Sequence, residues 1–115
     1  MVPTMTPREF EEAARRALLM VESAVDDLDA DEIDIEGEEN VITLGFPGGD
    51  QFVLNVNAPA QEIWLSANRR AWHFAPAAGD RFVSTAPGGE DLLACLGHLI
   101  GEKLGRPVAL GGFGG

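Results

Sequence analysis

Apolar side chains recur every three or four residues through the first quarter of the chain, the spacing that places them on one face of an α-helix. Thr6, Pro7 and Glu9 form a typical helix start: a capping threonine, a proline at the first helical position, and a glutamate that completes a capping box. We therefore predict a helix from about Pro7 to Leu28. Its apolar face consists of Phe10, Ala14, Ala17, Leu18, Val21, Val25 and Leu28, and Leu19 falls outside it.

Beyond this helix the hydrophobic pattern changes to a period of two, which is typical of β-strands. Turns rich in glycine, proline and asparagine divide this part of the chain into six short segments. Because the connections are short, an antiparallel meander is the natural topology. The predicted strands are residues 33–36, 41–46, 51–57, 61–66, 71–75 and 81–85.

Helical spacing returns near the C-terminus, and Gly105 and Pro107 follow its last apolar residue as a typical helix end. Gly97 and Gly101 lie inside this predicted helix and each weaken it by up to about 1 kcal/mol relative to alanine. They would also let the helix lie close against a neighbouring segment. The apolar positions of this helix are Leu92, Leu93, Leu96, Leu99, Ile100 and Leu104.

The order helix, six strands, helix predicts an α+β fold: an antiparallel six-stranded sheet with the N- and C-terminal helices packed on one face. With 115 residues and no internal repeat, we expect a single domain over residues 1–115. Residues 1–5 should form a flexible leader and residues 111–115 a flexible tail. Near that tail, Val108, Leu110 and Phe113 could lie in a groove.

The charge balance excludes several classes of function. A net charge of −11 is unsuited to nucleic acids and to anionic membrane surfaces, both of which attract lysine and arginine. No apolar run approaches the roughly 20 residues of a membrane span, and the N-terminus lacks the apolar core of a signal peptide. We therefore expect a cytoplasmic protein. Cys95 is the only cysteine, so no intramolecular disulfide can form.

Carboxylates are concentrated in residues 22–39, which hold ten of them and neither lysine nor arginine. Two like charges about 6 Å apart repel by roughly 0.7 kcal/mol even in water, and most surfaces relieve this repulsion by mixing the two signs. This stretch either attracts a cation or a basic partner, or belongs to a protein that is simply very acidic. Its carboxylates are Glu22, Asp26, Asp27, Asp29, Asp31, Glu32, Asp34, Glu36, Glu38 and Glu39.

The strand predicted at residues 61–66 distinguishes the two faces of the sheet. Ile63 and Leu65 suit the core, so Trp64 should point to the face that the helices leave open. Tryptophan is enriched at contact surfaces, although an indole on an open face can also merely shield the sheet. Asn55 and Asn57 of the preceding strand should lie near Trp64.

Two stretches of the sequence resemble the frataxin family in its bacterial form. The first is Asn55-Val56-Asn57-Ala58-Pro59-Ala60-Gln61-Glu62-Ile63-Trp64-Leu65-Ser66, followed by Trp72-His73-Phe74. The second joins the acidic helix end Asp26-Asp27-Leu28-Asp29 to the strand Ile33-Asp34-Ile35-Glu36. The similarity covers about residues 6–110 and has the same order of helices and strands.

The resemblance implies a role in iron–sulfur cluster assembly and no enzymatic activity. Frataxins bind iron (Fe²⁺ or Fe³⁺) weakly through an acidic ridge, and they contact a cysteine desulfurase and the scaffold protein. We expect a monomer, with metal-dependent oligomers as an alternative. Glu11 stands where some bacterial members have a histidine and is a further candidate ligand. Carried over by position, the acidic ridge consists of Glu22, Asp26, Asp27, Asp29, Asp31 and Asp34.

The same resemblance assigns partner contacts to Asn55, Asn57 and Trp64. The chain departs from the family at Asn57 and Glu62, where glutamine is usual, and its loop at residues 68–70 is shorter than in eukaryotic members. His73 matches a family position on the open face, where it is either an imidazole contact or a plain surface histidine.

The chemistry of the acidic ridge favours weak binding of hard cations. Carboxylates suit iron, magnesium, manganese and calcium, and the spacing of Glu22, Asp26 and Asp29 places them on one helix face. Without histidine or cysteine no closed tetrahedral site forms, so we expect low affinity, little selectivity and sensitivity to salt. An EF-hand is excluded because its sixth loop position, which must be glycine, would be Glu32.

Other candidate chemistry is weaker. Cys95 and His98 lie three residues apart on the second predicted helix, but two ligands make a poor metal site, and we interpret Cys95 as a packing residue. The sequence shows no nucleophile with its base and no glycine loop that opens a helix for phosphate. Two alternatives stay open: an acidic protein-interaction module with no specific metal role, and an enzyme that oxidises Fe²⁺ at a buried carboxylate set.

Overall fold

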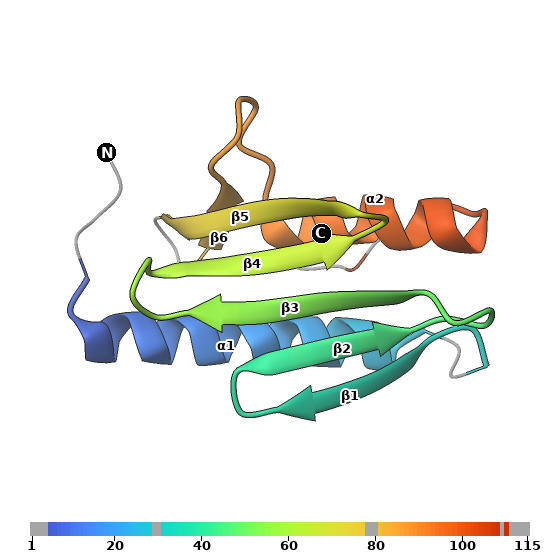
Figure 1. Ribbon diagram of the computed structural model, residues 1–115, viewed down its shortest axis with the longest axis horizontal. Coiled ribbons are helices and arrows are strands. Elements are labelled where there is room, and N and C mark those ends of the chain that lie inside the picture. Colours follow the sequence, from blue (N-terminus) through green and yellow to red (C-terminus); the bar gives the residue numbers. More distant parts are fainter. Residues whose placement is uncertain (1–4, 29–30, 78–80, 109, 111–115) are drawn as a thin grey trace.

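The computed structural model describes residues 5–28, 31–77, 81–108 and 110. Six strands form one antiparallel sheet in chain order, and both helices lie on one face of it while the other face is open (Figure 1). The predicted α+β fold is confirmed. The elements are α1 (Pro7–Asp26), β1 (Asp34–Glu38), β2 (Val41–Gly45), β3 (Gln51–Asn57), β4 (Glu62–Ala67), β5 (Arg70–Ala77), β6 (Arg81–Ser84) and α2 (Leu92–Leu104).

Helix α1 begins with the predicted capping box. The Glu9 N–H donates to Thr6 Oγ1 at 3.1 Å and Glu9 Oε1 accepts from the Thr6 N–H at 2.9 Å. The hydrogen bond with the Thr6 backbone lowers the pKa of the Glu9 carboxyl most, and the hydrogen bond with the Thr6 side chain lowers it further. The helix ends at Asp26 with Asp27 as its C-cap, two residues before the predicted Leu28. Leu28 still packs against the core, which explains why its spacing matched the helix.

Helix α1 turns its apolar stripe toward the sheet, and Phe10, Ala14, Val21 and Val25 are each at most 2% exposed. Leu19, which fell outside the predicted stripe, is 56% exposed on the opposite side of the helix. None of the helices in the described part of the chain is both long and apolar enough to cross a membrane.

The β1–β2 hairpin is tighter than predicted. Residues 39–40 alone form its turn, so Gly37 and Glu38, which were predicted as turn residues, pair with Ile42 and Val41. The strand therefore runs two residues further than expected and starts one residue later. The extra paired residues matter for the site, because they lengthen the acidic edge strand of the sheet.

The β4–β5 hairpin also closes through a two-residue turn. Asn68 and Arg69 have φ angles of 53° and 64°, the left-handed conformations that two-residue hairpin turns require. Arg70 therefore belongs to β5 instead of the turn, and β4 extends to the buried Ala67. Most of the predicted connection at residues 77–80 lies outside the described residues.

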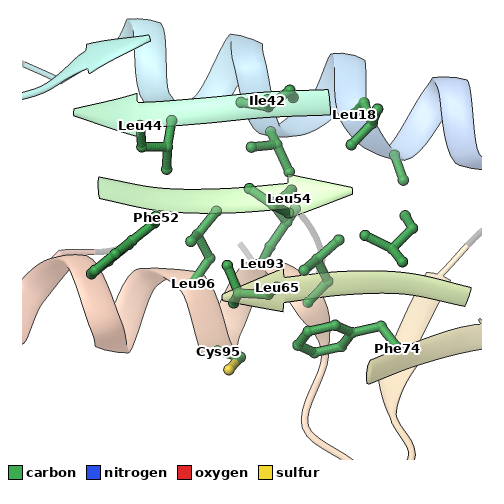
Figure 2. Close-up of a cluster of buried hydrophobic side chains, with 14 of the residues drawn as sticks. Leu18, Ile42, Leu44, Phe52, Leu54, Leu65, Phe74, Leu93, Cys95 and Leu96 are labelled. Atoms are coloured by element: carbon green, nitrogen blue, oxygen red, sulfur yellow. The ribbon is translucent and has the colours of Figure 1, made fainter. Parts of the chain in front are cut away.

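Strand alternation places the apolar side chains of the sheet beneath the helices. Leu54 lies between Ile42 and Leu65 in the register, so one apolar row crosses three strands (Figure 2). Burying each such side chain contributes about 1.5–3 kcal/mol, and no polar or charged side chain of the described residues is buried. The sheet residues without exposed surface are Ile42, Leu44, Phe52, Leu54, Ile63, Leu65 and Phe74.

Two glycines let the chain after α2 return close along that helix. These are Gly97 and Gly101, both within α2, while Gly105 ends the helix with a φ of 74°, as predicted. A Cβ on Gly97 would lie 3.0 Å from the Val108 carbonyl oxygen, and one on Gly101 would lie 2.9 Å from the Arg106 carbonyl oxygen. Val108 packs against the core and Leu110 is 8% exposed, whereas Phe113, predicted to join them, lies outside the described residues.

Cys95 is a buried packing residue of α2, as predicted (Figure 2). Burial is the main cause that raises its pKa to about 12, and the charge of Glu90 adds to this effect. His98 is exposed and lies with Nδ1 2.6 Å from Glu90 Oε2. The sulfur is thus held in the core, while the imidazole is on the surface.

Replacing Gly101 by alanine should destabilise the fold. The new methyl group meets a backbone oxygen that cannot easily move, and this overpacking outweighs the gain in helix propensity, for a net loss of about 1–2 kcal/mol. Urea denaturation measures the change. The exposed neighbour Glu102 provides the control, since Glu102→Ala should alter the free energy of unfolding by less than about 0.5 kcal/mol. A Gly101→Ala protein at least as stable as the wild type would contradict the close approach.

Cys95 should be almost unreactive toward iodoacetamide in the native protein. With a pKa of about 12, only about one thiol in ten thousand is ionised at pH 8, compared with roughly a quarter at the ordinary pKa of about 8.5. Mass spectrometry should show slow alkylation that accelerates by more than about a hundredfold in denaturing urea. Equal rates in the two states would refute the buried thiol.

Candidate functional site

The acidic ridge follows the junction of α1 and β1. Asp26 ends α1, Asp27 is its C-cap, Asp31 lies in the connection, and Asp34 begins β1, and all four side chains are exposed. Glu22, one turn before the end of α1, is half-buried. The remaining predicted ligand, Asp29, lies outside the described residues.

The electrostatic setting of this junction favours a cation. The C-terminus of a helix carries partial negative charge, which basic side chains usually offset. In α1 the last turn has no basic residue, and Glu22, Asp26 and Asp27 add their carboxylates there instead. A positive ion beside the end of α1 would relieve both the repulsion among the carboxylates and the unfavourable interaction with the helix dipole.

The ridge carboxylates approach the edge strand β1 from two sides. Glu22 reaches it from the helix side, where a Cβ on Gly37 would lie 2.9 Å from Glu22 Oε1. Asp34 precedes Ile35, which pairs with the buried Leu44, so Asp34 points to the open face of the sheet. The ridge therefore bends around the edge of the sheet.

This arrangement is a dispersed surface and not a preformed metal centre. Across residues 5–28, 31–77, 81–108 and 110, no three His, Cys, Asp or Glu side chains converge to hold a metal ion. Glu11 is further removed, because it precedes Glu22 by eleven positions, which correspond to about 16 Å along a helix axis. A cation at the ridge would keep much of its water.

Tertiary structure supplies positive charge that sequence proximity did not reveal. Arg106 forms an ion pair with Glu32, and Lys103 forms one with Asp50. Both cations come from the C-terminal end of α2 and its continuation, far from the acidic stretch in sequence. Glu32 is therefore partly neutralised, and no local pattern could have indicated this pairing.

The open face of the sheet carries its own acidic edge. Glu36 and Glu38 pair with Thr43 and Val41, and all these side chains lie on the same face as Asp34, because residues two apart on a strand share a face. Glu36 and Glu38 were not among the predicted site residues, although the alternation of their strand could have identified them. The acidic surface thus extends along the whole of β1.

Trp64 lies on this open face, as the alternation of β4 predicted. Its neighbours Ile63 and Leu65 have no exposed surface, while Trp64 is half-buried. Across the sheet, Trp64 pairs with Asn55 of β3 and with His73 of β5.

A hydrogen bond and a ring stack fix the indole of Trp64. Its Nε1–H donates to Glu62 Oε1 at 2.8 Å, and His73 Nδ1 lies 3.6 Å from the same oxygen. The rings of Trp64 and His73 are stacked, with centroids 4.5 Å apart and an interplanar angle of 11°. Glu62 was not among the predicted partner residues, and for His73 the sequence left open an imidazole contact or a plain surface histidine, but both share the strand periodicity of Trp64.

The two asparagines predicted beside Trp64 differ in their roles. Asn55 is exposed directly across from Trp64. Asn57 uses its Oδ1 to accept the Ala60 N–H at 3.0 Å, which closes the turn between β3 and β4. Asn57 therefore shapes the hairpin, while Asn55 presents its amide to the solvent.

Comparison with known proteins is consistent with this geometry. Residues 3–106 match the family model of the frataxin-like domain. The chain is 36% identical over 114 residues to the iron–sulfur cluster assembly protein CyaY of Cupriavidus necator, covering 96% of this chain and all of that protein. It is 37% identical over 112 residues to the CyaY of Cupriavidus taiwanensis, covering 94% of this chain and 98% of the relative.

A solved structure supports the fold independently of sequence identity. Frataxin from Psychromonas ingrahamii superposes with a TM-score of 0.83 at 19% identity, over 94% of this chain and the whole of that chain. Because the family model covers most of the sequence and the CyaY relatives match nearly end to end, the protein described here belongs to the frataxin family.

Proposed function

We propose that this protein binds iron weakly and regulates iron–sulfur cluster assembly by contacting a cysteine desulfurase and its scaffold protein. The observation that carries the proposal is the group of carboxylates at the C-terminus of α1, whose last turn holds no basic residue, together with the acidic side chains along the edge strand β1. The relatives from Cupriavidus are named iron–sulfur cluster assembly proteins, which supports the pathway. Iron is the cargo of such a protein and not a resident cofactor, and no catalytic step is assigned to the chain.

The dispersed ridge suits transient contact with iron. Exposed carboxylates are hard ligands for Fe²⁺ and Fe³⁺, and few of them can reach one ion at the same time without rearrangement. Binding should therefore be dominated by long-range attraction, which falls as salt screens the charges. A ridge of this kind releases its ion readily, as delivery or sensing requires.

The open sheet face suits the partner contact. Its centre holds the half-buried Val41 and Val53, flanked by Trp64 on one side and by the acidic β1 edge on the other. An apolar centre with a polar rim and an aromatic anchor is the usual anatomy of a protein interface. We assign Asn55 and Trp64 to direct contact, and Asn57 to holding the hairpin that presents them.

One observation favours a second candidate, an acidic interaction module without a specific metal role. Glu32 and Asp50 are paired with Arg106 and Lys103, so part of the negative charge serves the fold. Such a module would bind a basic partner through the same surface, but it would show no preferred metal site at physiological salt.

Anaerobic titration with Fe²⁺ tests the ridge. Amide NMR signals of residues 22–34 should broaden before those of other carboxylate-rich regions. The double substitution Asp26→Asn with Asp27→Asn removes two unit charges. Each attracts a divalent ion about 6 Å away by roughly 1.4 kcal/mol in water, which salt at about 0.15 M reduces by about half, so the affinity should weaken about tenfold.

Glu102→Gln on α2 is the matched control and should leave the Fe²⁺ affinity unchanged, and Glu11→Gln tests separately whether that outlying residue contributes. Broadening spread evenly over all carboxylates, or equal affinity of the double variant and the wild type, would refute a defined ridge and favour the second candidate.

Trp64→Ala tests the partner surface. Loss of a central aromatic anchor typically costs 2 kcal/mol or more, so binding to a purified desulfurase–scaffold complex should weaken by more than about tenfold. Calorimetry measures the affinity, and urea denaturation checks that the domain stays folded. Leu19→Ala, which removes an exposed apolar side chain on α1 away from the open face, should have no effect. Undiminished binding of the Trp64→Ala protein would remove this residue from the interface.

A further inference from the structure

We propose that Glu62 and His73 are positioning residues that hold Trp64 as a receptor for an arginine side chain of the partner. This inference rests on the proposed partner surface and specifies the chemistry that the surface recognises. It follows from three contacts on the open face: the Trp64–Glu62 hydrogen bond, the Trp64–His73 stack, and the approach of His73 to Glu62.

The hydrogen bond to Glu62 fixes the orientation of the indole. A tryptophan on an open sheet face can flip about its side-chain torsions, and a partner that needs one orientation must pay for the lost freedom. The 2.8 Å bond from Nε1 to Glu62 Oε1 selects one orientation before any partner arrives. Both residues project from the same strand on the same face, so the bond needs no rearrangement elsewhere in the fold.

His73 restrains the indole from the neighbouring strand. Because the rings are nearly parallel with centroids 4.5 Å apart, the imidazole covers one face of the indole. Asn55 lies across from Trp64 on the opposite side, on β3. The indole is thus supported on its β5 side, while its β3 neighbour is the exposed and uncharged Asn55, and we place the incoming group on that side.

The charge of Glu62 selects the incoming group. A carboxylate has about four acceptor positions, and this one receives a single hydrogen bond from Trp64. Its other oxygen, Oε2, has no partner within the part of the chain that the structure describes. The residues paired with Glu62 and Trp64 on β3 are the neutral Asn57 and Asn55, so no lysine or arginine of this strand pair competes for the carboxylate.

A guanidinium fits this combination better than other side chains. It is planar and stacks on aromatic rings, and its N–H groups pair with carboxylates in a fixed geometry. An ammonium can pair with Glu62 but does not stack, whereas a neutral aromatic partner would stack but leave the carboxylate unused. The acidic side chains of β1 on the same face add attraction for a basic segment.

The positioning role can be measured on the protein alone. In ¹H–¹⁵N NMR the Trp64 indole N–H should be rigid and slow to exchange with water. Glu62→Gln keeps an oxygen that accepts the bond and should retain this signature, whereas Glu62→Ala should lose it. His73→Phe should preserve the stack and His73→Ala should loosen it. Identical indole dynamics in all five proteins would overturn the positioning role.

The recognition role needs a pair of probes that differ only in charge. A short peptide whose only charged side chain is one arginine should shift the Trp64 indole signal. The same peptide with citrulline, which is the uncharged isostere, should bind at least about threefold more weakly. Glu62→Gln should weaken the arginine peptide by about threefold to tenfold and leave the citrulline peptide unchanged. Equal binding of the two peptides, or an unaltered Glu62→Gln protein, would overturn the selection of arginine.

The same variants separate this inference from the proposed function. If Trp64→Ala no longer matters for binding to the desulfurase–scaffold complex, the partner surface itself is refuted. If Trp64→Ala abolishes that binding but Glu62→Gln and His73→Ala bind as tightly as the wild type, the partner surface stands and the arginine receptor is refuted. If the Glu62→Gln protein binds the desulfurase–scaffold complex more weakly than the wild type, and associates with it more slowly at low salt, the result supports both the partner surface and the arginine receptor.

Discussion

Burial of one sheet face beneath two helices is the interaction on which the rest of this structure depends. The fully buried residues of β2 to β5 interlock with α1 and α2, and strand periodicity then dictates what the opposite face presents. Trp64 stands on the open face because Ile63 and Leu65 occupy the core. The display of the candidate partner surface is therefore a direct consequence of core packing, and any shift of register by one residue would turn the indole inward.

The same packing explains where the negative charge can collect. α1 covers the sheet up to β1 and ends there, so its acidic C-terminus meets the acidic edge strand. Beside this junction, the C-terminal end of α2 brings Lys103 to Asp50, and Arg106 just beyond the helix reaches Glu32. Positive charge thus reaches Glu32 in the α1–β1 connection and Asp50 in the turn before β3, while Asp26, Asp27 and Asp34 lie exposed beside them. Carboxylates that stabilise the fold and carboxylates of the proposed ridge are therefore neighbours on one acidic surface.

The two candidate surfaces meet along β1 and across the open face. The acidic side chains of β1 point to the same face as Trp64, and the half-buried Val41 and Val53 lie between them. A partner that docks on the open face would therefore lie next to the ridge, and the proposed iron and partner sites would share a boundary. On the side of this face away from β1, the contacts among Glu62, Trp64 and His73 hold the indole in one orientation. Both sides of the face therefore carry negative charge, and the side at β4 and β5 also carries a fixed aromatic ring.

Periodicity and capping chemistry in the sequence determined the order of the elements and the α+β class. The capping box at Thr6 and the end of α2 at Gly105 could be predicted because they depend on interactions within a few residues. The outward direction of Trp64 could be predicted because side chains on a strand alternate between its two faces. The turns at residues 39–40 and at Asn68–Arg69 were predicted in the right place but one or two residues too long, since the pairing between strands decides where each turn begins and ends. Only the tertiary structure decided that Glu32 is neutralised by Arg106, that Asn57 closes a turn, and that Glu62 and His73 hold the indole. The Glu32–Arg106 and Trp64–His73 contacts join residues of different elements, so sequence spacing carries no record of them. The Asn57–Ala60 and Glu62–Trp64 contacts are local, but they depend on turn and strand conformations that the pairing of strands fixes.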